Sequence, residues 1–196
     1  MSVAVSTDTG HAPATEHARY SRLEINRLGY WMFILSESML FLGLLAGRFY
    51  LQGTHRPAEL SQILGLIITS VLLLSSLTAY LSEVAIAHDD RAGYLRDTLF
   101  TIILGLIFVG GVAFEWAQAF AHFPPDTGFG TVFFSMTGMH AFHVISGIFL
   151  LALMYWQVKR GMYSAQNHFA PEAIVKYWHF VDVVWVFFYV ALYLVS

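Results

Sequence analysis

Ionisable side chains occur inside several apolar stretches of this chain, where a bilayer or a protein core would have to accept them. A charged side chain near the centre of a bilayer costs at least about 2.5 to 3.5 kcal/mol on insertion scales, so each one needs a partner or a purpose. The residues whose types and spacing could support chemistry are Glu37, Glu115, His140, His143, His179 and Asp182.

Glu37 lies in an apolar run that begins at Leu28. At 1.5 Å per residue it would sit roughly 14 Å along a helix, near the middle of a membrane. We expect its carboxyl group to be protonated at neutral pH unless a donor reaches it, because lipid-like surroundings disfavour the charged form. Two interpretations stay open: a proton-linked or lipid-modulated carboxyl, and a hydrogen-bonding link between helices.

His140 and His143 are spaced i and i+3, on one face of a helix. A metal site could use such a pair, but bis-His haem ligation draws on facing helices, and a di-iron bundle needs a Glu-x-x-His motif on each of two helices, which this sequence lacks. We therefore favour hydrogen bonds to carboxyl groups on neighbouring helices and expect no metal site. Glu115 would lie at a depth comparable to that of His140, so the sequence predicts a contact between these two residues.

His179 and Asp182 form a second i, i+3 pair. They could support each other or bridge to Glu37. A His-Asp pair also orients an imidazole in catalysis or metal binding, but no Ser or Cys nucleophile constellation accompanies it here. A structural polar network is the favoured interpretation, and we assign no catalytic residue.

The composition indicates that a bilayer surrounds these residues. The chain has 196 residues, 57% of them apolar and 12% charged, against roughly 25% charged in soluble domains. It has no cysteine, which excludes disulfides, thiolate-bound copper or zinc, iron-sulfur clusters and covalently attached c-type haem. The net charge of -3 gives no indication of a nucleic-acid partner.

Five apolar runs are long enough to cross a membrane, at about 28–50, 62–86, 98–121, 131–157 and 177–195. The loops between them are short and leave no room for a soluble domain. Residues 1–27 are polar and small, and we expect a flexible cytoplasmic tail there. The predicted fold is all-α, a single membrane domain of five transmembrane helices over residues 28–196.

The positive charges predict the orientation, because cytoplasmic loops carry an excess of Lys and Arg. Only Arg48 and Arg56 fall on one side of the expected topology. Eight fall on the other: Arg19, Arg22, Arg27, Arg91, Arg96, Lys159, Arg160 and Lys176. We expect a cytoplasmic N-terminus and an external C-terminus.

Several segments resemble subunit III of the haem-copper terminal oxidases. Tyr-Trp-His-Phe-Val-Asp-Val-Val-Trp at 177–185 resembles the signature of that family's last helix. Residues 137–147 are similar to its Gly-Phe-His-Gly-Phe-His-Val helix, and 33–41 to the helix with its buried, carbodiimide-reactive glutamate. Phe114-Glu115-Trp116 stands where the family has a glutamate between aromatic residues. The resemblance covers roughly residues 28–196.

The resemblance implies a subunit that binds no haem or copper itself. Such a subunit packs against subunit I, binds phospholipid, and helps to sustain proton uptake and turnover stability while the complex reduces oxygen to water. It implies subunits I and II as partners, with haem and copper in those partner subunits, and a place in a larger respiratory supercomplex. Glu37 would take the position of the reactive glutamate, and the other five residues the matching positions of a polar network.

The resemblance leaves the exact complex open. Seven-helix members have two further N-terminal helices that form a V-shaped, lipid-filled cleft, whereas five-helix forms occur among bacterial cytochrome c and quinol oxidases. A related protein accompanies some nitric oxide reductases. Two hypotheses of other classes remain: a small membrane cytochrome or quinone-reactive enzyme with histidine ligands, and a transporter with an intramembrane carboxyl relay, although we find no inverted repeat.

Overall fold

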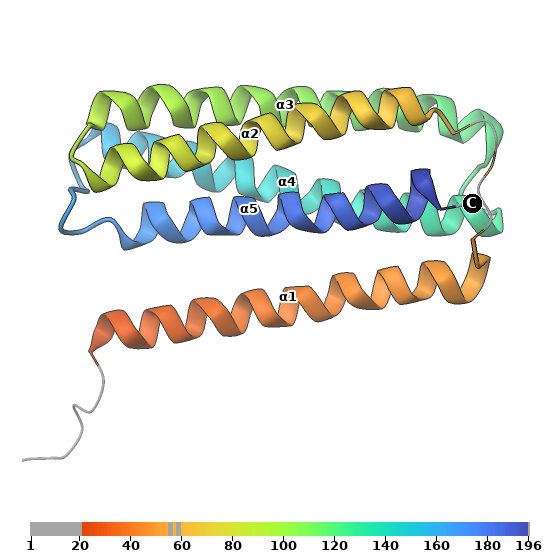
Figure 1. Cartoon of the computed structure of the whole chain (residues 1–196), viewed down its shortest axis with the longest axis horizontal. Coiled ribbons are helices and arrows are strands. Elements are labelled where there is room, and N and C mark those ends of the chain that lie inside the picture. The colour runs from red at the N-terminus through yellow and green to blue at the C-terminus, as the bar shows by residue number, and fades with distance from the viewer. Residues whose placement is uncertain (1–20, 55–56, 58–59, 196) are drawn as a thin grey trace, which may run out of the picture.

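The computed structural model describes residues 21–54, 57 and 60–195, and the described residues are predominantly helical (Figure 1). Among these described residues, five helices are long and apolar enough to cross a membrane, which confirms the predicted all-α, five-helix architecture. They are α1 (Arg22–Gln52), α2 (Gln62–Ala87), α3 (Arg91–His122), α4 (Gly128–Lys159) and α5 (Phe169–Tyr189), and α5 continues into one π-helical turn, η1 (Val190–Leu194).

Each helix begins where a local signal allows it, which is often outside the apolar run. α1 begins at Arg22 rather than Leu28, because Ser21 and Glu24 form a capping box: the Ser21 hydroxyl accepts from Glu24 N–H, and the Glu24 carboxylate from Ser21 N–H. The part of the expected tail from Arg22 to Arg27 is therefore helical. The rest of that tail, residues 1–20, lies outside the described residues.

Helices α2, α3, α4 and α5 form a bundle, and α1 lies along one side of it (Figure 1). α2 packs against α3 and α5, and α4 packs against α3 and α5, while α1 contacts α4 and α5. Much of the surface of α1 is apolar and exposed; Leu35 and Met39, for example, are both about 60% exposed. Such a surface is suited to lipid or to other membrane helices.

Two of the connecting loops meet at one end of the bundle. The Asp89 carboxylate, between α2 and α3, accepts a hydrogen bond of 2.6 Å from the backbone N–H of Ala165, between α4 and α5. At the other end, the Arg48 guanidinium donates to the backbone oxygen of Gly53 and lies over the ring of Phe129. Two residues of the orientation count, Arg19 and Arg56, lie outside the described residues, so the predicted orientation stays a prediction.

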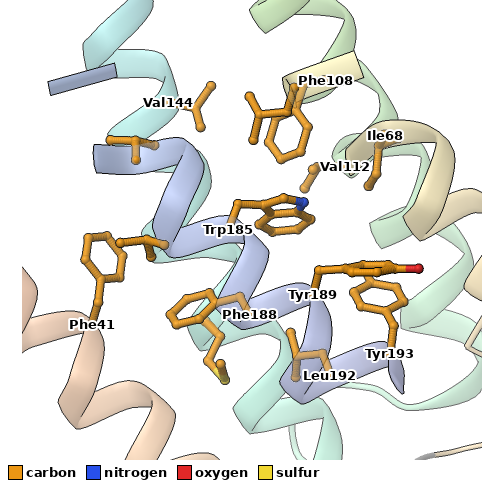
Figure 2. Close-up of a cluster of buried hydrophobic side chains, with 14 of the residues drawn as sticks. Phe41, Ile68, Phe108, Val112, Val144, Trp185, Phe188, Tyr189, Leu192 and Tyr193 are labelled. Atoms are coloured by element: carbon orange, nitrogen blue, oxygen red, sulfur yellow. The ribbon is translucent and has the colours of Figure 1, made fainter. Parts of the chain in front are cut away.

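Aromatic side chains of α5 fill the centre of the bundle (Figure 2). Trp185 is completely buried, and the Phe108 ring of α3 meets it edge-on with 4.9 Å between ring centroids. Close helix approach makes room for these rings: a Cβ on Gly105 would lie 2.7 Å from the Trp178 ring. The core thus brings α5 against α2, α3 and α4, and it places the polar residues of the predicted network at helix interfaces.

Candidate functional site

Glu37 and His143 form an ion pair or hydrogen bond between α1 and α4. His143 Nε2 lies 3.1 Å from Glu37 Oε2, while His143 Nδ1 lies 2.8 Å from the backbone oxygen of Met139. A carbonyl oxygen only accepts, so Nδ1 carries a proton. The hydrogen bond between Nε2 and the carboxyl then holds one proton, either on the ring or on Glu37. We expected a protonated Glu37 unless a donor reached it, and His143 Nε2 is such a donor when the shared proton is on the ring.

This pair lies near the midpoint of α1 and is only partly shielded. Glu37 comes 15 residues after Arg22, about 22 Å along a helix of roughly 46 Å. Its side chain is 22% exposed and that of His143 is 8% exposed. The Phe41 ring, one turn after Glu37, packs edge-on against the His143 ring at 4.7 Å. The arrangement can hold a proton at a site that is accessible from the lipid-facing side.

The polar contacts continue from His143 to α5. The Ser146 hydroxyl donates to the backbone oxygen of His143 and lies 2.9 Å from the Tyr177 hydroxyl. Tyr177 belongs to the signature stretch of α5, so the Glu37 pair and that stretch are connected through one serine.

His179 and Asp182 do not bridge to Glu37 through any hydrogen bond among the described residues. His179 Nδ1 lies 2.6 Å from the Ser76 hydroxyl of α2. Neither Asp182 oxygen makes a hydrogen bond within the described part of the chain. Asp182 is 2% exposed. His179 therefore bonds α2, and it also lines the cavity between α1 and α5.

The predicted hydrogen bond between Glu115 and His140 is wrong. Glu115 Oε2 accepts a hydrogen bond of 2.6 Å from the Tyr193 hydroxyl. His140 is fully buried, its ring lies 4.7 Å from the Trp185 ring, and neither ring nitrogen has a hydrogen-bond partner among the described residues. The depth estimate was a poor guide because it did not fix the direction in which each side chain leaves its helix.

Sequence reasoning missed a set of indole-hydroxyl hydrogen bonds between helices. Trp178 Nε1 donates to Ser75, Trp185 Nε1 donates to Thr69, and Trp116 Nε1 donates to Thr137. The signal for the first two was present, because Trp178 and Trp185 are two helical turns apart and the small hydroxyl residues of α2 follow a similar spacing. These bonds join α5 to α2, and α3 to α4.

Within the described part of the chain, no group of three or more His, Asp or Glu side chains could hold a metal ion. The histidine rings also face different surroundings. His143 contacts Glu37 and the backbone, His179 contacts Ser76, and His140 lies among aromatic rings. This geometry does not fit a haem ligand set, and what the network can do is store or relay protons and fix helices relative to one another.

Comparisons with known proteins identify the family. The family model described as cytochrome c oxidase subunit III matches residues 14–196. A cytochrome c oxidase subunit 3 of Thermostichus vulcanus is 33% identical over 193 residues, which cover 95% of both chains. One of Synechocystis is 29% identical over 204 residues, 99% of this chain and 87% of the relative.

A longer relative shows a similar likeness over part of its length. The cytochrome c oxidase subunit 3 of Cyprinus carpio is 34% identical over 179 residues, which cover 85% of this chain and 68% of the carp protein. The region that the family model matches contains the five helices described above, as the resemblance of the signature segments implied. The chain belongs to the cytochrome c oxidase subunit III family and is a subunit of a haem-copper oxidase complex.

Proposed function

We propose that this chain is a redox-silent subunit that packs against subunits I and II, which hold the haem and copper, in a bacterial plasma membrane. The observation that carries the proposal is that His143 and His179 bond protein partners and His140 lies among aromatic rings, in a chain of the subunit III family. The excess of positive charge at the end where the Asp89 loop lies supports a cytoplasmic position for that end.

We assign to the Glu37 and His143 pair a role in proton uptake by the complex. The pair shares one proton across a 3.1 Å contact and can be rearranged between a neutral and an ionised form without a change in net charge. A further proton would convert it to a cationic pair, so the site can take up and return a proton.

A groove between α1 and α5 supports the proposal of a bound phospholipid. At the N-terminal end of α1, a cavity of about 280 Å³ is lined by Arg27, Trp31 and Lys176, and Lys176 pairs with Glu172. Two further cavities of about 370 and 330 Å³ follow along α1 and α5, and each shares lining residues with the one before it.

The lining of this groove changes from charged to apolar along its length, as a phospholipid changes from its headgroup to its acyl chains. Cationic and aromatic side chains line its end, and apolar side chains such as Phe180 and Val183 line its continuation. Of the charged groups at the end, Glu172 offsets Lys176, so Arg27 leaves one net positive charge for a phosphate. We infer an anionic headgroup at Arg27 and Lys176, with an acyl chain between α1 and α5.

A mild-detergent purification with an optical spectrum tests the assembly. The tagged chain should co-purify with haem-bearing and copper-bearing subunits, and the chain stripped of its partners should be colourless. Haem absorbance in the stripped chain would overturn the proposal in favour of a small cytochrome. Parallel assays with reduced cytochrome c and with a quinol identify the electron donor; cytochrome c is expected from the names of the relatives.

Substitutions in the intact complex test the two site assignments. Glu37→Gln should lower proton uptake and shorten the active lifetime of the complex without loss of haem, whereas the half-buried Glu83→Gln in α2 is the matched control. For lipid, the double variant Arg27→Ala with Lys176→Ala should retain about thirtyfold less anionic lipid, since two basic contacts of about 1 kcal/mol each are lost and about 1.4 kcal/mol corresponds to tenfold. Arg22→Ala, one turn earlier and outside the cavity, should retain it. Equal retention in both would refute the lipid site.

A further inference from the structure

One oxygen of the Glu115 carboxyl group is buried without a partner. Oε2 accepts from the Tyr193 hydroxyl, but Oε1 has no hydrogen bond among the described residues, and the residue is 4% exposed. An unsatisfied buried polar atom costs about 1–3 kcal/mol, so native proteins pair such atoms with protein groups or with ordered water. Glu115 Oε1 therefore needs a hydrogen-bond partner that the described part of the chain does not supply.

A small cavity beside Glu115 can hold that partner. Its volume is about 30 Å³, and its polar lining consists of Glu115, Gln118 and His122 of α3 together with Ser61 at the start of α2. One water needs roughly 10–15 Å³ of such volume and two to four polar partners. Gln118, His122 and Ser61 are exposed, and His122 and Ser61 lie just outside the apolar runs at 98–121 and 62–86, so we place the opening of the cavity at the aqueous end of the bundle.

The π-helical turn η1 fixes the other side of the carboxyl group. A π turn holds one residue more than an α turn, so it rotates the residues after it relative to a continuous α-helix. Tyr193 lies in this turn, its ring stacks on Tyr189 at 5.2 Å (Figure 2), and its backbone oxygen accepts from the Gln62 amide at 2.9 Å. Its hydroxyl is thus a fixed donor to Oε2, which leaves Oε1 as the atom that takes up or releases a proton.

We propose that Glu115 exchanges a proton with the aqueous phase at the α3–α4 end of the bundle through a single water bound in this cavity. In the forward step the O–H bond at Oε1 breaks, the water accepts the proton, and that water passes a proton to the bulk; the return step reverses these transfers. Among the described residues, the titratable groups beside Glu115 are Tyr193, which donates to it, and His122 of α3, which lines the same cavity; Tyr189 stacks on Tyr193. The proposal is independent of the role assigned to Glu37.

Infrared spectroscopy of the intact complex tests this exchange. We expect a protonated-carboxyl band of Glu115, which is identified because it shifts when glutamate is isotope-labelled and disappears in Glu115→Gln. On transfer to heavy water, this band should move to the frequency of the deuterated carboxyl group within the mixing time. The internal reference is Asp182, whose carboxyl group is buried and does not line the cavity. The Asp182 proton can exchange with solvent only when the surrounding structure opens locally. An opening free energy of about 1.4 kcal/mol slows exchange tenfold, so we expect the Asp182 band to exchange at least about tenfold more slowly than the Glu115 band.

Leu64→Phe tests the cavity without removal of the carboxyl group. Leu64 lines the cavity, and a larger side chain there should displace the water and slow the Glu115 band to the rate of Asp182. The matched control is Ile63→Phe, which makes a similar change in size one residue earlier in α2. Ile63 is 74% exposed and does not line the cavity, so this variant should leave the exchange rate of Glu115 unchanged.

Three results would overturn the proposal. They are the absence of a protonated Glu115 band at every pH tested, exchange of that band no faster than that of Asp182, and equal exchange in Leu64→Phe and Ile63→Phe. If Glu115→Gln does not fold, the glutamate band slowed by Leu64→Phe identifies Glu115, and the same comparison with Asp182 applies.

Discussion

The contact between Glu37 and His143 should be measurable as a coupling free energy between α1 and α4. We would compare Glu37→Ala, His143→Ala and the double variant with the native chain in a double-mutant cycle. The Nε2 to Oε2 distance of 3.1 Å lies in the range of ordinary hydrogen bonds, and the pair is partly exposed to the membrane side. Hydrogen bonds between membrane helices average about 0.6 kcal/mol and reach about 1.7, so we expect about 1 kcal/mol for this charge-capable pair.

The cycle separates this contact from the packing of the imidazole ring. His143→Ala also removes the edge-on contact with Phe41, which is worth about 0.5–1.5 kcal/mol, so it should destabilise the chain more than Glu37→Ala does. Because the Phe41 contact is lost in both the single and the double variant that lack His143, it cancels from the coupling energy.

Reversible unfolding of the full chain in bicelles provides the assay. A control cycle pairs Glu37 with His140, which lies one turn from His143 on α4 and contacts the aromatic rings of α3 and α5 instead. Independent sites add to within about 0.3–0.5 kcal/mol, so the control coupling should stay below that limit. A Glu37–His143 coupling no larger than the control value would refute the assignment of this pair as a link between helices.

Two further predictions concern packing and loop geometry. Gly105→Ala should destabilise the chain by about 1–3 kcal/mol, because the new Cβ would lie 2.7 Å from the Trp178 ring. Gly110→Ala on the same helix has open space around it and should stabilise the chain by up to about 1 kcal/mol. Thermal unfolding of both variants distinguishes crowding from helix propensity. Asp89→Ala removes the acceptor of the Ala165 N–H and should speed hydrogen exchange of the Ala165 amide by about tenfold. Asp89→Asn keeps an oxygen acceptor and tolerates the left-handed backbone at φ 57°, so it should leave that exchange nearly unchanged. Equal exchange in both variants would contradict the role of this bond.

Hydropathy predicted every span and, to within one residue, both ends of α2, but the other four helices begin before the start of their apolar runs. An apolar run reports only the hydrocarbon layer, and a helix continues beyond that layer until a cap or a turn stops it. The capping box of Ser21 and Glu24 extends α1 to Arg22, and the Asp90 side chain accepts from Gly93 N–H at the start of α3. Both signals are legible in the sequence, so the early starts of these two helices were predictable in principle.

The pairing of polar residues was less predictable, and His140 shows why. Residues three apart on a helix differ by about 60° in direction and 4.5 Å in height, which is enough to aim them at different neighbours. His143 consequently meets Glu37 of α1, while His140 enters the aromatic cluster beside Phe108 and Trp185. The depth estimate paired His140 with Glu115. The hydrogen-bond partner of Glu115 is instead Tyr193, whose position depends on a π-helical turn that no pattern in the apolar sequence of this segment indicates.

The signature stretch of α5 acquires a physical meaning from these contacts. Buried N–H and O–H groups within a membrane need partners, because no water is available to satisfy them. Trp178 and Trp185 donate to hydroxyl groups of α2, His179 bonds Ser76 of the same helix, and Tyr177 meets Ser146 of α4. The aromatic and polar residues at 177–185 therefore hold α5 against α2 and α4. A stretch whose residue types could ligate a metal thus serves to pack α5 against its neighbours.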